Sequence, residues 1–315
     1  MRMTDPLDQG APLPDLESPE GDPRTELAQR VGGALLVLPG FFEFGTRIEG
    51  IDATDLFSLN SVLGTSIEVQ VVHTLNRMRS IWDPDEEWVG YRFERQSQTF
   101  PDVRLVRRGA GQHDIAMGIE LKGWYLLSKE GVPSLRFQTT PAACSPFDLI
   151  AVVPWHLSNV LSGTPVAREP WVSSARHAAE FRNHWWENIR ETSDPKGISA
   201  PAGVHPYPTK DMQIADTPDY DRGGNFGRLA RVVGLMTEFI ASAKAQDAMG
   251  IPINDWILFL RRHSDNSDPD QVTSSLSQEL SRSTRAGSEQ DAARVLEHLE
   301  ALTRLLAGSD LTAGS

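Results

Sequence analysis

Apolar and polar positions alternate along the middle of the chain in a pattern that predicts a small β-sheet. Two alternating runs, 100–106 and 114–122, are joined by a segment rich in arginine and glycine, which is typical of a β-hairpin. Residues 88–93 alternate as a further strand, and the apolar run 147–154 predicts a buried strand. Ahead of these strands, apolar residues recur at three-to-five spacing over 61–79, which predicts a helix.

Helical patterns continue beyond the hairpin. Thr140 followed by Pro141 is typical of a helix start, and it predicts a helix between the hairpin and the buried strand. Aromatic residues at helical spacing predict a helix over 173–190, and a strong helix is expected over 226–248. The segment 193–225 is rich in proline, glycine and aspartate and is too long for a plain connector, so we interpret it as a functional loop or a flap.

The two ends of the chain differ from this body. Residues 1–24 are acidic and rich in proline, and they predict a disordered tail. Residues 263–315 predict a linker and a last apolar-striped helix that docks on the body or on a second subunit. Between the ends we expect an α/β (α+β) fold: a core over 25–192 with a central mixed β-sheet flanked by helices, and a loop and helical extension over 193–262.

Charged residues lie within the strands of the predicted hairpin. Because side chains alternate along a strand, Glu120 and Lys122 project from one face and their apolar neighbours from the other. Asp102, on the adjoining strand, is expected across from them. Two carboxylates and one ammonium group therefore converge, and two hard oxygen ligands suit Mg²⁺. A sheet with a solvated charged face is the alternative interpretation.

The sequence resembles a nuclease motif at these positions. Pro101-Asp102 and Glu120-Leu121-Lys122, with 17 residues between Asp102 and Glu120, are similar to the pattern of the PD-(D/E)xK nuclease superfamily, to which restriction endonucleases belong. The match covers a few positions within 101–122. The predicted order of helix, three strands, helix and strand is also the order of that superfamily's core. The resemblance implies a restriction-endonuclease-like fold and Mg²⁺-dependent hydrolysis of phosphodiesters.

The resemblance also implies a role for each hairpin residue. Asp102 and Glu120 would hold one or two Mg²⁺ ions, with the backbone carbonyl of Leu121 as a further ligand. Lys122 would orient the attacking water or lie beside the developing charge.

Two further positions enter the expected site. In this superfamily the helix before the first strand often carries a glutamate that points at the metal, and Glu68 is the matching position. Glu68 would bind a second ion or fix the water of the first; a solvated glutamate on a helix face is the alternative. Gln138, on the strand expected after the hairpin, would touch DNA or the water around the ion.

The net charge of -13 opposes a large nucleic-acid surface, because DNA binding usually draws on basic residues. The acidity is concentrated at the ends: residues 1–60 hold 4 basic and 11 acidic residues, and 263–315 hold 4 and 9. The segment with the candidate site is nearly neutral and has a local basic cluster of Arg104, Arg107 and Arg108. A small basic footprint is compatible with this distribution.

The remaining composition describes an ordinary soluble protein of 315 residues, 39% hydrophobic and 23% charged. No apolar run approaches the ~20 residues that a membrane helix needs. The N-terminus fits no secretory signal, so we expect a cytoplasmic protein. The single cysteine, Cys144, excludes an internal disulfide and a cysteine-built zinc site, and we interpret it as a small core residue.

We therefore predict a metal-dependent endodeoxyribonuclease, a type II restriction endonuclease that acts on double-stranded DNA as a homodimer. A structure-selective or RNA-directed nuclease of the same fold would keep the same residues. A catalytically inactive protein that binds DNA or protein as a regulator is the alternative outside the enzyme class. The recognition sequence is not readable, because the residues that contact bases lie on loops that differ between such enzymes.

Overall fold

The computed structural model describes residues 11–12, 19, 21–49, 59–96, 99–109, 113–160, 162–223 and 225–262. Most of the predicted tail, 1–24, lies outside the described residues. The predicted linker and last helix, 263–315, lie entirely outside them.

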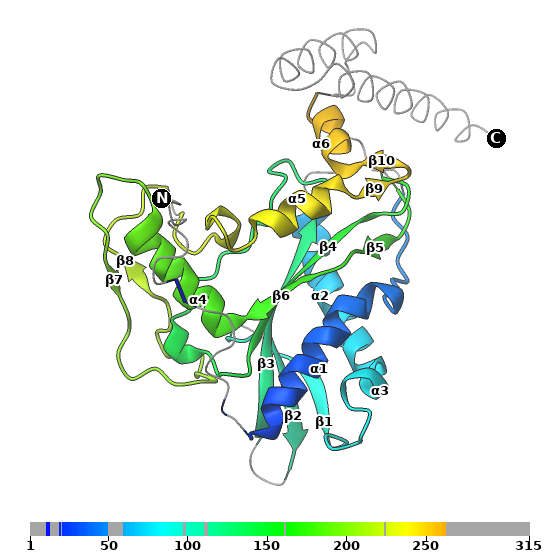
Figure 1. Ribbon diagram of the computed structural model, residues 1–315. Coiled ribbons are helices and arrows are strands. Elements are labelled where there is room, and N and C mark those ends of the chain that lie inside the picture. Colours follow the sequence, from blue (N-terminus) through cyan, green and yellow to red (C-terminus); the bar gives the residue numbers. More distant parts are fainter. Residues whose placement is uncertain are drawn as a thin grey trace, which may run out of the picture.

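Among the described residues, a six-stranded mixed sheet forms the centre of the molecule (Figure 1). Its strands are β1 (Tyr91–Arg95), β2 (Val103–Arg108), β3 (His113–Tyr125), β4 (Leu149–Leu157), β5 (Pro165–Ala167) and β6 (Trp171–Ser174). β1, β2 and β3 are antiparallel neighbours, β4 is parallel to β3, and both β5 and β6 pair antiparallel with β4. The expected mixed sheet with helices is confirmed, and the expected hairpin is β2–β3.

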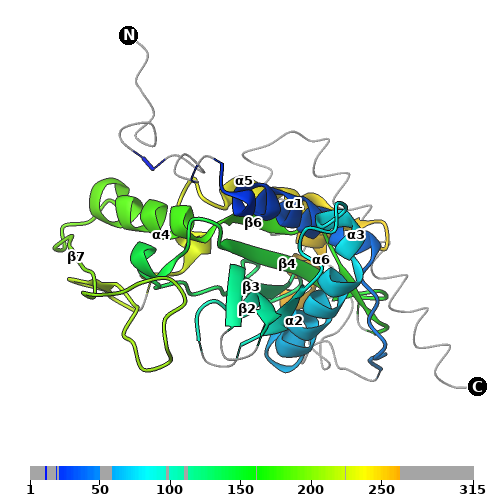
Figure 2. The same cartoon turned by 90° about the horizontal axis from the view of Figure 1, so that it is seen from below.

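Helices and short hairpins surround this sheet. Figures 1 and 2 show α1, α2 and α3 gathered toward one end of the molecule, and α4 with the β7–β8 hairpin toward the other. The helical elements are α1 (Pro23–Val37), η2 (Leu38–Gly40), α2 (Leu59–Arg77), α3 (Arg79–Trp82), η4 (Pro141–Ala143), α4 (Ala175–His184), η5 (Trp185–Ile189), η6 (Leu229–Arg231), α5 (Thr237–Ala245) and α6 (Ile253–Arg262). The short hairpins pair β7 (Ile198–Ser199) with β8 (Thr217–Pro218), and β9 (Asp247–Ala248) with β10 (Ile251–Pro252).

Two predicted helices are present with shifted bounds. The helix expected over 61–79 is α2, which ends at Arg77 and is followed by the single turn α3. The helix expected over 173–190 begins at Ala175, because the residues before it pair with β4 as strand β6. Its last part, Trp185–Ile189, is a π-helix.

The helix predicted over 226–248 is wrong over its first half. The chain instead forms the 3₁₀ turn η6 and then α5, which begins at Thr237. Gly227 and Gly234 have φ angles of 83° and 92°, in the left-handed region, and a right-handed helix cannot pass through such residues.

The helix predicted to start at Thr140 is also wrong. Only the 3₁₀ turn η4 forms, after which Cys144 is extended. Pro146 disfavours the helical conformation at Ser145, and the Ser145 backbone N–H donates to the Asp148 carboxylate at 2.8 Å. Local hydrogen bonding therefore replaces a helix between the hairpin and β4.

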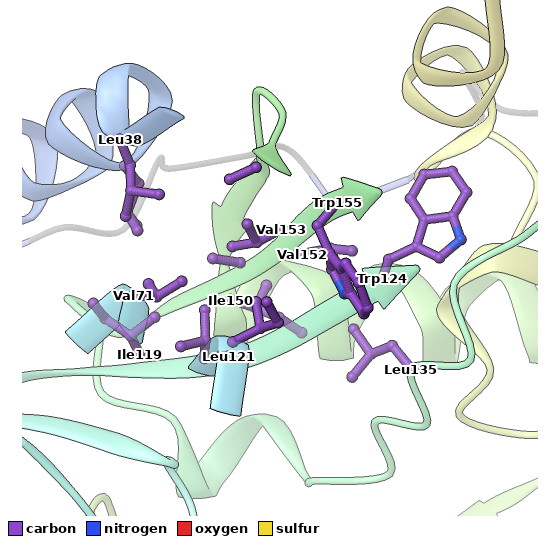
Figure 3. Packing of buried hydrophobic residues seen from close by; sticks show 14 of the residues in the cluster. Leu38, Val71, Ile119, Leu121, Trp124, Leu135, Ile150, Val152, Val153 and Trp155 are labelled. Carbon is purple, nitrogen blue, oxygen red and sulfur yellow. The ribbon is translucent and has the colours of Figure 1, made fainter. Parts of the chain in front are cut away.

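Most of the large buried apolar side chains share one core. Trp124 and Trp155 are fully buried on the parallel pair β3–β4. Figure 3 shows Val71 of α2 close to Ile119 of β3, and Trp124 directed toward α5, where its ring lies 6.0 Å from that of Phe239. The core thus joins the predicted extension 193–262 to the sheet. Of the helices that the structure describes, none has both the length and the apolar character needed to cross a membrane.

Candidate active site

The register of β2 against β3 brings Asp102 beside Glu120. Val103 pairs with Ile119, so the next position outward places Asp102 across from Glu120, and opposed residues of antiparallel strands project to the same face. Each carboxylate also contacts the backbone of the other strand. Glu120 Oε2 accepts from the Asp102 N–H at 3.3 Å, and Asp102 Oδ2 accepts from the Leu121 N–H at 3.3 Å. The structure therefore brings together the two acids that the sequence pattern singles out.

Glu68 of α2 faces the same group of side chains. Its Oε1 lies 3.9 Å from Lys122 Nζ, and its Oε2 lies 3.5 Å from Arg95 Nη2. Asn76 connects α2 to β1, because its amide exchanges two hydrogen bonds of 2.9 Å with the backbone of Phe93. The Glu68 side chain is only 13% exposed, so it is not a solvated helix-face glutamate.

Arg95 is a site residue that the sequence analysis missed. Arg95 is the last residue of β1 and pairs with Val103, the first residue of β2. Asp102 is the residue directly before Val103. The only sequence signal for it is its place at the end of an alternating strand, which does not reveal a partner on a helix 27 residues earlier.

Burial and mutual repulsion disturb the ionisation of these acids. Burial first, then the charge of Asp102 and that of Glu68, raise the pKa of Glu120 to about 8. Burial also raises the pKa of Asp102 and of Glu68, against the opposing effect of Lys122. Without a cation the ionised forms of these acids are therefore disfavoured, and a bound cation would favour them.

The donor chemistry of the pair fits a hard divalent cation. Magnesium is usually held by one or two protein carboxylates and completes its shell with water and phosphate oxygens, and Asp102 with Glu120 supplies two carboxylates. Within the described ranges, no three acidic, histidine or cysteine side chains lie close enough together to hold a metal ion. The carboxylate of Glu68 is directed at Lys122 and Arg95.

An open pocket of about 300 Å³ adjoins the two carboxylates. Asp102 and Glu120 line it together with Thr99 and Phe100. Its other wall comes from the segment between β7 and β8, through Pro208, Thr209, Lys210, Met212 and Ile214. The long loop that the sequence marks as functional therefore reaches the candidate site, although nothing in the sequence singled out Lys210 within it.

Other predicted contact residues are placed differently. Gln138 is not among the residues that line this pocket. Arg104 donates to the backbone carbonyl of Phe100 at 2.8 Å, and Arg107 pairs with Asp114 at 2.8 Å. These two members of the predicted basic cluster are therefore engaged within the protein, and the side chain of Arg108 lies outside the described atoms.

Neither the protein-family models nor the curated proteins include a match to this chain.

Proposed function

We propose that the protein is a metal-dependent endonuclease that hydrolyses DNA phosphodiester bonds, with a core of the PD-(D/E)xK type. The observation that carries the proposal is the pairing of Asp102 with Glu120 at the end of the hairpin, with Lys122 two residues further along β3. A merely solvated charged face does not account for carboxylates that are largely withdrawn from water and accept hydrogen bonds from the backbone N–H groups of Asp102 and Leu121.

The positions of the site residues suggest a separate role for each in the proposed reaction. Asp102 and Glu120 would hold Mg²⁺, which when bound lowers the pKa of its water and offsets charge on the scissile phosphate. Lys122 Nζ lies 3.9 Å from Glu68 Oε1 and would place a positive charge next to the attacked phosphate. Glu68, paired with Lys122 and Arg95, orients these two cations and would position the water.

The proposal is tested with isosteric variants of the paired acids. Asp102→Asn and Glu120→Gln each replace a carboxyl group by an amide of nearly the same volume, and Lys122→Met removes the ammonium group. Each is expected to lower Mg²⁺-dependent cleavage of plasmid DNA by at least about 100-fold. Circular dichroism and thermal midpoints report whether the fold is retained.

Glu87→Gln is the matched control, because Glu87 is exposed in the turn between α3 and β1. It should cleave as wild type does, and a chelator should abolish cleavage by both proteins. Wild-type activity in all three site variants would place the site elsewhere. Tight DNA binding without cleavage would instead favour the inactive regulator.

The substrate class and assembly belong to the same proposal. We infer a type II restriction endonuclease, a cytoplasmic homodimer that cuts both strands of duplex DNA. Discrete fragments from phage DNA would support sequence-specific cutting. Cleavage of only branched DNA or of RNA would support the structure-selective or RNA-directed alternative. Sedimentation of the protein with and without DNA measures the oligomeric state.

A further inference from the structure

The segment 208–213 crosses beside the paired carboxylates and lies between two fixed points. It belongs to the connection between β7 and β8, which pair with each other at Ile198–Ser199 and Thr217–Pro218. Four of its residues, Pro208, Thr209, Lys210 and Met212, line the pocket that also contains Asp102 and Glu120.

The first fixed point is Tyr207, directly before the segment. Its hydroxyl donates to Asp148 Oδ1 at 3.1 Å. Asp148 is fully buried, and the same oxygen accepts from the Gly118 N–H in β3 at 2.7 Å. One end of the segment is therefore tied to the strand that carries Glu120.

The second fixed point is the stretch from Ile214 to Asp216, directly after the segment. The Ile214 carbonyl accepts from the Thr140 N–H at 2.7 Å, and the Asp216 N–H donates to the Gln138 carbonyl at 2.8 Å. The Asp216 carboxylate forms an ion pair of 2.7 Å with Arg182, and the two side chains are 0% and 1% exposed. Both ends of the segment are thus held by buried polar contacts.

Lys210 is the cation that this segment presents to the pocket. Its side chain is exposed, and no carboxylate of the described residues lies within ion-pairing distance of it. The two other cations near the acids, Lys122 and Arg95, already face Glu68. An ammonium group on a flexible stem is a common point-charge ligand for phosphate.

We propose that Lys210 binds a backbone phosphate of the nucleic-acid strand whose phosphodiester lies at Asp102 and Glu120. The inference rests on the proposed function and adds a substrate-binding residue from the far wall of the pocket. Thr209 supplies a hydroxyl donor beside it, and Phe100 and Met212 line the same pocket with apolar surface.

The test compares Lys210→Ala with Lys196→Ala. Lys196 is also an exposed lysine of the loop region, but it does not line the pocket. Binding of a fluorescent DNA duplex is measured by anisotropy in the full-length Glu120→Gln protein, over a series of salt concentrations. Lys210→Ala should raise Kd about tenfold and reduce the slope of log K against log salt by about 1, because one phosphate contact is lost. Lys210→Arg should retain the slope, and Lys196→Ala should change neither quantity.

The wild-type protein and Lys210→Ala are then compared in cleavage with Mg²⁺, where the variant should raise KM more than it lowers kcat. If wild type cleaves DNA but Lys210→Ala binds with unchanged Kd and salt slope, the inference is wrong and the proposed function stands. Equal weakening by Lys196→Ala and Lys210→Ala would also overturn it, since the effect would be one of general charge. If wild type neither binds nor cleaves DNA, both the inference and the proposed function fail.

Discussion

Asp216→Asn is predicted to destabilise the protein strongly, because it leaves a buried guanidinium group without its carboxylate. Arg182 Nη2 donates to Asp216 Oδ2 at 2.7 Å, and Nη1 donates to the carbonyls of Phe137 and Thr139 at 2.7 and 3.1 Å. Burial lowers the pKa of Arg182 to about 10, which still leaves it charged at neutral pH. The substitution therefore removes the charge that compensates Arg182 and keeps the side-chain volume.

The expected cost follows from the burial of the pair. Removing one partner of a buried ion pair typically costs about 3–5 kcal/mol. The side chains of Arg182 and Asp216 are 1% and 0% exposed, so solvent screening does not reduce this range. Whole domains are stable by only about 5–15 kcal/mol, so the loss is a large share of the total.

Equilibrium unfolding in urea, followed by tryptophan fluorescence, measures the change at pH 7. Glu43→Gln is the control, because the Glu43–Arg77 ion pair of 3.1 Å is exposed at both side chains and should contribute little. The double variant Arg182→Met/Asp216→Asn removes both charges. Its loss of unfolding free energy should be smaller than the sum of the losses in the two single variants, because the double variant contains no uncompensated buried charge.

A loss below about 1 kcal/mol in Asp216→Asn, or strict additivity in the cycle, would refute this account of the buried pair. The same variant tests the anchoring of the segment 208–213. Under conditions where the Asp216→Asn protein stays folded, its Kd for DNA should rise, as the Kd of Lys210→Ala does.

Two further predictions concern the support of the site. Gly118→Ala should destabilise the protein by about 1–3 kcal/mol in urea unfolding and reduce DNA cleavage, because a Cβ there would clash with Pro101 and lie 3.0 Å from Asp148 Oδ1. Gly33→Ala is the control and should not destabilise the protein, because the space around Gly33 is open. A Gly118→Ala protein as stable as Gly33→Ala would contradict the packing argument. Burial raises the pKa of Asp148 to about 6 from 3.8, so the folded state holds a proton that the unfolded chain has lost, and the contribution of Asp148 to stability falls as pH rises from about 4 through 6. Tyr207→Phe removes a donor to the ionised Asp148 and should lower the thermal midpoint more at pH 7 than at pH 4; equal shifts at both pH values would show that this hydrogen bond does not favour the charged form.

Local patterns in the sequence predicted the elements around the site. The alternation over 100–122 predicted the hairpin, and helical periodicity predicted α2 with Glu68 on it. These elements are readable because strand and helix periods are set by neighbouring residues along the chain. The errors over 226–248 and after Thr140 arose where single residues, such as Gly227 and Pro146, or a side-chain hydrogen bond override the local pattern.

The tertiary structure alone decided which side chains meet. The sequence predicted that Asp102, Glu120 and Lys122 belong to one hairpin and could project together, but the register of β2 and β3 made the two acids neighbours. Arg95 and Lys210 came to the site through contacts between segments far apart in the chain, namely the packing of α2 on β1 and the anchoring of the segment 208–213. Such contacts depend on buried polar groups brought together by the whole fold, and no local spacing encodes them.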